Sequence, residues 1–179
     1  ANEYLSKFAR LMRMHLNMAE KSSILLHEEI QRLEYYLSLE QLRFDDKMEW
    51  SIKINPDLDT YHYEIPNMII QPFVENAIWH GIMPSSQKGS IALSIDPTTS
   101  GGLEINITDN GVGFEHQPKR GNTDHESKGT RLIRERLMLL DASVPDVIRF
   151  EHLSPGTGVY ITLSPKMIRK MTSEAAFAQ

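Results

Sequence analysis

The first 45 residues contain no glycine or proline, and their apolar positions recur with the spacing of an α-helix. The polar triplet at 21–23 separates two apolar stripes, which predicts two helices joined by a short break. We expect these amphipathic helices to bury their stripes on the rest of the chain or on a second copy of it. The first stripe contains Leu5, Phe8, Leu11, Met12 and Leu16, and the second contains Leu26, Ile30, Leu33, Leu37 and Leu39.

From Met48 onward, the apolar period changes to the alternation that is typical of strands. The turn-rich "PTTSGG" joins two of the predicted strands, which favours an antiparallel pair. One helix is predicted over "IPNMIIQPFVENAIWHG", opening near Pro66 and closing on Gly81, and another over "TRLIRERLMLLD". The predicted strands are "MEWSIKI", "SIALSID", "LEINITD", "VIRFEHL" and "GVYITLS".

This order of elements predicts an α/β two-layer sandwich, with a mixed, mostly antiparallel sheet and helices on one face. The predicted organisation is a helical pair at 1–45, the α/β domain at 46–165 and a C-terminal tail at 166–179. The long polar segment "EHQPKRGNTDHESKG" ends at Gly129 and is predicted to be a lid or a binding loop, because loops of that length in compact domains are usually functional.

Composition excludes several classes of function. The net charge is -5 and there is no run of basic residues, so nucleic acid is not expected as a partner. The chain has no cysteine, which excludes disulfides, thiolate metal ligands and a cysteine nucleophile. No apolar stretch approaches the roughly 18 residues of a membrane span, and the first residues lack the apolar core of a signal peptide, so we expect the chain as given to be soluble.

Asn76 stands out because it lies within an otherwise apolar predicted helix. At about 100° per residue, the apolar positions share one arc, while Asn76, His80, Trp79 and Pro72 fall on the opposite side. Asn76 is therefore either a solvated helix position or a ligand contact, and Trp79 favours a covered surface over open solvent. The predicted core arc contains Ile70, Phe73, Val74, Ala77, Ile78 and Gly81.

Two further patterns carry candidate chemistry. A predicted strand ends at Asp109 and is followed by Gly111 and Gly113, so a carboxylate that accepts from an amine stands beside backbone that a ligand can approach closely. "DNG" is also a common turn, so this pattern is weak when taken alone. Gly129 precedes a predicted helix whose free amide groups and dipole favour a phosphate.

Taken in order, these segments resemble the ATP-binding catalytic domain of LytS-type sensor histidine kinases, within the GHKL or Bergerat-type class that includes gyrase. The resemblance covers about residues 1–165. Five segments carry it, namely "EEIQRLEYYLSLEQLRF", "IPNMIIQPFVENAIWHGIM", "DNGVGF", "SKGTRLIRERLMLL" and "GTGVYITLSP".

The resemblance implies roles for the residues around the base. Asp109 matches the carboxylate that accepts from the adenine 6-amino group, and Gly111 and Gly113 match the loop beside the base. Thr157 matches a threonine near the adenine in the closing strands.

At the phosphates, the resemblance implies that Asn76 coordinates Mg²⁺, a role that suits an amide oxygen. Gly129 matches the second glycine box, with Lys128 near enough to offer positive charge and residues 115–128 as a mobile lid. His80 is a candidate phosphate contact.

The chain also departs from the wider class. Gyrase-like members carry a water-activating glutamate where this chain has Pro72, and Glu75 points about 100° away from Asn76, so ATP hydrolysis by that route is not expected. Trp79 replaces a lysine that many histidine kinases have. Ser127 replaces the first glycine of the second glycine box.

We therefore expect a Mg²⁺- and ATP-dependent histidine kinase portion that transfers phosphate to a histidine outside this chain, because the acceptor pattern N-P-H-F-x-F-N is absent. His27 is the chain's own weaker candidate acceptor, and no residue is assigned as catalytic. The resemblance implies as partners an acceptor helix, a response regulator and a second copy of the chain. It also implies the cytoplasmic portion of a bacterial inner-membrane sensor. The alternatives are a degenerate nucleotide-binding or dimerisation module and another enzyme of the same fold.

Overall fold

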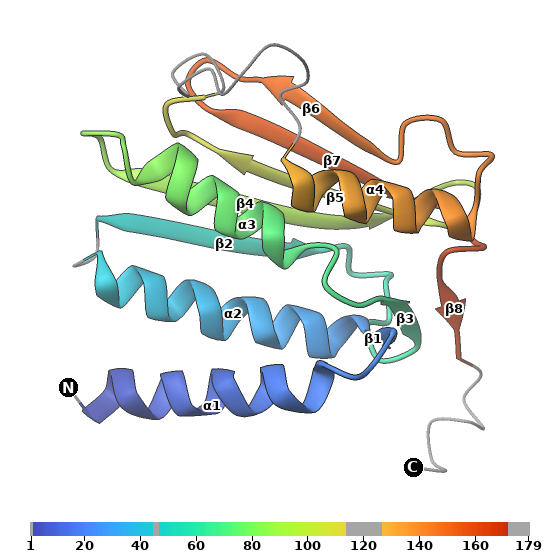
Figure 1. The fold of residues 1–179 in the computed structure, drawn as a ribbon, viewed down its shortest axis with the longest axis horizontal. Helices are drawn as coiled ribbons and strands as arrows, with labels where there is room; N and C mark the ends of the chain where they lie inside the picture. The colour runs from blue at the N-terminus through green and yellow to red at the C-terminus, as the bar shows by residue number, and fades with distance from the viewer. Residues whose placement is uncertain (1, 45–46, 114–126, 172–179) are drawn as a thin grey trace.

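The computed structural model describes residues 2–44, 47–113 and 127–171 (Figure 1). Helices and strands alternate along most of the chain. In chain order the elements are α1 (Asn2–Met18), β1 (Ser23–Leu25), α2 (Leu26–Arg43), β2 (Met48–Ile54), β3 (Tyr63–Pro66), α3 (Gln71–Asn76), the π-helical turn η1 (Ala77–Ile82), β4 (Gly89–Pro97), β5 (Leu103–Asp109), α4 (Lys128–Leu140), β6 (Ile148–His152), β7 (Thr157–Leu163) and β8 (Arg169–Lys170).

The main sheet has five strands in the order β2-β4-β5-β7-β6. β2 runs parallel to β4 and the other neighbours are antiparallel, including the predicted pair β4 and β5. Every second side chain of β5 is buried, beginning with Leu103, Ile105 and Ile107. Figure 1 shows α3 and α4 lying over one face of the sheet, which confirms the predicted α/β sandwich.

The helical pair is present, and its two apolar stripes have different environments. The stripe on α2 packs into the core, where Leu26, Leu33 and Leu37 are at most 1% exposed. On α1, Leu11 is buried, but Leu5 is 62% exposed and much of the stripe faces outward. Among the described residues, no helix is long and apolar enough to cross a membrane.

A second, three-stranded sheet was not predicted. β3 lies between β1 and β8, and both pairings are antiparallel. β1 begins within the predicted break between the helices, and β8 lies in the predicted tail. The expectation that a helix opens near Pro66 is wrong, because Pro66 ends β3 and the helix begins at Gln71, with Pro72 in its first turn.

The predicted core face of this helix is confirmed, although the helix changes form along its length. α3 has six residues, and η1 continues it with the wider π-helical turn. Ile70, Phe73, Val74, Ala77 and Ile78 are all buried against the sheet side of the molecule. The sequence pattern therefore placed the polar positions correctly away from the core.

Candidate functional site

Asn76 is the last residue of α3 and is half-buried. Its side chain makes no hydrogen bond to any part of the chain that the structure describes, so its amide oxygen is available to a ligand. The π-helical turn begins at the next residue and closes with the amide of Met83 donating to the carbonyl of Ile78 at 2.8 Å. Such wide turns interrupt α-helices mostly where function requires them.

The side chains on the polar side of this helix have different environments. Glu75 accepts a hydrogen bond from Gln71 at 2.8 Å, and the guanidinium of Arg43 on α2 lies 4.5 Å from the centre of the Trp79 ring. Trp79 therefore packs on α2, which agrees with the expectation that it covers a surface, whereas His80 one residue later is exposed. Pro72 instead lines a groove together with Gly129 of α4.

Asp109 ends β5 and is almost buried at 8% exposure. The strand register places it directly opposite Thr157 of β7, so these two predicted adenine contacts are neighbours. One carboxylate oxygen accepts from the amide of Gly111 at 2.8 Å. Burial raises the pKa of Asp109 to about 6, although the backbone amides of Gly111 and Thr157 oppose this rise. A carboxylate held this way favours a ligand that donates a hydrogen bond.

Gly111 is required for a close backbone approach. A Cβ added there would lie 2.1 Å from the carbonyl carbon of Gly81, and the amide of Val112 donates to the Gly81 oxygen at 3.0 Å. Gly81 also faces Asp109, because its own added Cβ would lie 2.7 Å from a carboxylate oxygen. We expected the missing side chain of Gly111 to leave room for a ligand. In the structure, the backbone of Gly81 near the end of the helix occupies that room. We expected Gly81 to be a helix end on the core face and did not predict its contact with Asp109.

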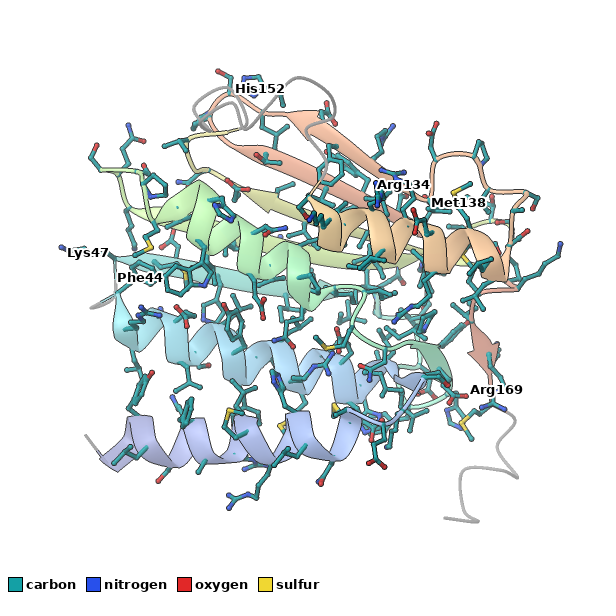
Figure 2. All side chains as sticks on the ribbon, viewed as in Figure 1. Phe44, Lys47, Arg134, Met138, His152 and Arg169 are labelled. Atoms are coloured by element: carbon teal, nitrogen blue, oxygen red, sulfur yellow. The ribbon has the colours of Figure 1, made fainter. Side chains whose placement is uncertain are left out.

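Gly113 adopts a backbone conformation that side chains rarely tolerate, with a φ of +70°. A Cβ there would approach the carbonyl oxygen of Gly156 at 3.2 Å and the ring of His152 at 3.2 Å. His152 ends β6 and is labelled in Figure 2. The turn after Asp109 therefore packs tightly on the loop that leads into β7.

The start of α4 explains the serine that replaces a glycine. Ser127 is the N-cap of the helix, and its hydroxyl accepts from the amide of Thr130 at 3.1 Å. Lys128 and Gly129 follow in the first turn, and both are exposed. His80 is exposed too, within η1. The predicted lid residues 115–126 lie outside the described residues.

Replacing Ser127 by alanine is expected to lower the free energy of unfolding by about 1 kcal/mol, because the amide of Thr130 loses its partner at the helix start. Urea unfolding of the two chains measures this difference. Ser143→Ala is the control, since Ser143 donates to Asp141 in a turn remote from the start of α4. A loss well below 0.5 kcal/mol at Ser127 would mean that the cap does not stabilise α4.

The groove between α3 and α4 has a volume of about 550 Å³. Its lining is mainly apolar, with Met68, Pro72, Leu132 and Ile133 on its walls. In the described ranges, no group of three or more acidic or histidine side chains could hold a metal ion alone. Asn76 with its unpaired amide oxygen instead fits a magnesium ion that takes most of its ligands from water and phosphate.

Comparisons with known proteins relate the chain to bacterial sensor kinases. A family model described as histidine kinase matches residues 1–48. The sensor protein LytS of Oceanobacillus iheyensis is 34% identical over 149 residues, which cover 78% of this chain and 25% of that protein. The sensor histidine kinase/phosphatase LytS of Staphylococcus aureus is 30% identical over 169 residues, covering 91% of this chain and 29% of that protein. The chain thus spans about a quarter of these relatives' length.

Solved structures share the fold at low sequence identity. The histidine kinase domain of a blue-light activated kinase from Erythrobacter litoralis has a TM-score of 0.55 and 15% identity, covering 89% of this chain and 74% of that one. The catalytic domain of histidine kinase ThkA has a TM-score of 0.54 and 11% identity, covering 79% of this chain and 94% of that one.

Proposed function

Because this chain is homologous to LytS-type sensor histidine kinases over most of its length, we propose that it is the ATP-binding catalytic portion of a two-component kinase. The observation that carries the proposal is the almost buried carboxylate of Asp109, placed beside Thr157 and the Gly111 turn. A buried acceptor in that surrounding suits the 6-amino group of adenine, which donates a hydrogen bond.

The base is recognised by the strand ends. Asp109 accepts from the adenine amino group, and Thr157, one strand away, contributes its hydroxyl. Gly111 and Gly113 let the turn after Asp109 pack closely on Gly81 and Gly156, and this packing holds the strand end in place for the base. Discrimination of adenine from guanine follows, because guanine presents a carbonyl oxygen where adenine has its amino group.

The phosphates lie between the two helices of the site. Asn76 would hold a magnesium ion through its amide oxygen, and the amides at the start of α4 would donate to the phosphates. Lys128 and His80, both exposed, would add positive charge or hydrogen-bond donors at the two sides. The magnesium ion, when bound, would supply neutralisation of the phosphate charge.

Hydrolysis is not expected to compete with transfer. Pro72 occupies the position of the water-activating glutamate in the wider class, and Glu75 is hydrogen-bonded to Gln71. The phosphorylated histidine belongs to a helix outside this chain. His27 is a poor acceptor because its ring stacks on Tyr61 with centroids 4.2 Å apart.

We further propose that the full-length protein is a homodimer, with the outward stripe of α1 as part of its interface. Phe8 is 46% exposed and Leu16 is 72% exposed, so the stripe has large apolar side chains that a second copy of the helix would cover. A response regulator then receives the phosphate. The relatives' names as sensor proteins support a sensory role, and the location that we propose is the cytoplasmic portion of a bacterial inner-membrane sensor.

Titration calorimetry of ATP into the chain, with and without Mg²⁺, tests the proposed site. The wild-type chain is expected to bind ATP more tightly with Mg²⁺, and Asn76→Ala is expected to lose this gain, about tenfold in affinity, while still binding adenosine. Asn106→Ala is the control, because Asn106 pairs with Ser94 in the sheet, away from Asn76. A folded wild-type chain that binds no ATP at millimolar concentration would instead favour a degenerate dimerisation module.

A further inference from the structure

Asn67 lies where the helical pair meets the sandwich, and it is only 4% exposed. Its side-chain nitrogen donates to the carbonyl of Met18 at 2.7 Å and to that of Lys21 at 3.0 Å. Its backbone amide donates to the carbonyl of Ser22 at 3.0 Å. One residue therefore satisfies three carbonyl groups at the end of α1 and in the connection that follows it.

The same side chain is also held by α2. Arg32 donates to the amide oxygen of Asn67 at 3.2 Å, and its other terminal nitrogen is paired with Glu29. Glu29 and Arg32 are at most 1% exposed, so this polar connection is inside the protein. Both donor hydrogens and the acceptor of the Asn67 amide are thus used within the described residues.

The backbone of Asn67 reaches the helices of the proposed phosphate site. Arg136 of α4 donates to the carbonyl of Asn67. Met68 then turns the chain with a φ of +58°, and α3 begins at Gln71. α1, α2, α3 and α4 are consequently joined around one buried residue.

The helix that carries Asn76 is therefore fixed at both ends. Its C-terminal end is held by the contact between Gly81 and Gly111. Its N-terminal end follows directly from the segment that Asn67 ties to the helical pair. Asn76 lies between these two contacts, so the orientation of its side chain depends on both of them.

We propose that Asn67 is a positioning residue that couples the helical pair to the proposed phosphate site. When the helical pair changes position, Asn67 changes the alignment of Asn76 and the start of α4 relative to the Mg²⁺-bound phosphates. This inference rests on the proposed function. The contact of Arg136 with Asn67 carries the alignment to α4, and the bonds of Asn67 to Met18 and Arg32 carry it to α1 and α2. Adenine recognition at Asp109 lies at the other end of the helix and does not depend on it.

The test compares two affinities in the same chain, those for adenosine and for ATP with Mg²⁺, by titration calorimetry. Asn67→Ala and Arg136→Met are expected to weaken Mg²⁺·ATP binding about tenfold relative to adenosine binding, which is the usual size of such couplings. Arg136→Lys keeps a donor for the carbonyl of Asn67 and is expected to restore most of the loss. Loss of folded structure alone would reduce both affinities together.

Asn55→Ala is the matched control, because Asn55 also bonds through both ends of its amide, to Asp96 and to the amide of Asp57, but lies after β2. It should leave the ratio of the two affinities unchanged. If Asn67→Ala does not fold, the two Arg136 variants decide. An unchanged ratio in folded Arg136→Met, with wild-type binding intact, overturns the inference alone. A wild-type chain that binds neither ligand overturns the proposed function and the inference with it.

Discussion

Replacement of Asp109 by asparagine is expected to make the nucleotide-free chain more stable at pH 8 while removing its affinity for adenosine. Burial raises the pKa of Asp109 to about 6, well above the usual range of an aspartate, so the charged form that exists at pH 8 is held at a cost. A pKa difference of that size corresponds to roughly 3 kcal/mol. We expect about half of that gain, because the asparagine amide has to be desolvated and offers one oxygen, where the carboxylate offers two, to the amides of Gly111 and Thr157.

The pH dependence of this difference follows from proton binding. Between about pH 4 and pH 6, the native chain binds more protons at Asp109 than the unfolded chain does. The contribution of Asp109 to stability therefore falls as the pH rises through that window and is constant above it. Urea unfolding should show the largest advantage of Asp109→Asn above pH 6 and a much smaller one near pH 4.

Adenosine binding should change in the opposite sense. The wild-type affinity is expected to rise as the pH rises from 5 to 7, since the carboxylate is the better acceptor, and Asp109→Asn should fall about 100-fold below it at pH 8. Adenosine is the right probe because it has no phosphate that titrates in this range. Asp96→Asn, at the far end of β4, is the control and should alter neither property. A less stable Asp109→Asn chain that still binds adenosine would contradict both expectations.

Gly111→Ala is expected to destabilise the chain by about 3 kcal/mol, because a Cβ 2.1 Å from the backbone of Gly81 forces the helix and the turn apart. The contact that would be lost is the amide of Val112 with the oxygen of Gly81. Both ends of that bond lie beside Asp109, so adenosine affinity should fall with stability.

Gly129→Ala is the matched control for this substitution. The nearest atom to an added Cβ there is the hydroxyl oxygen of Ser127 at 3.8 Å, and the residue lies in the first turn of α4. Alanine should therefore be neutral or stabilising by up to about 1 kcal/mol. Urea unfolding of both variants decides the matter, and equal losses in the two would show that the Gly81 contact is not responsible.

The parts that the sequence predicted correctly depend on local periodicity. The helical spacing from Ile70 to Ile78 gave the buried face of the helix, and strand alternation gave β4 and β5 with their pairing. These features need no knowledge of which distant residues meet. The expected roles of Asp109 and Thr157 at one adenine site came instead from the family resemblance, and the strand register shows that the two residues are neighbours.

The parts that the sequence could not predict depend on contacts between distant segments. The helical wheel indicated that Trp79 covers a surface, but it could not show that the partner is Arg43, more than thirty positions earlier. Gly81 gained its role only through the turn at Gly111. Asn67 carries no local signal, and its importance follows from carbonyl groups at the end of α1. β8 was missed because two residues are too few to show alternation.

The small sheet also has a consequence for how the chain is made on the ribosome. β1 and β3 can pair as soon as Pro66 has emerged, but β3 must wait for β8 until Lys170 has been made. Arg169 then pairs with Glu64, which already accepts from Ser23. Until β8 has emerged, the outer edge of β3 remains unpaired, and a nascent chain is exposed there to strand addition by its neighbours.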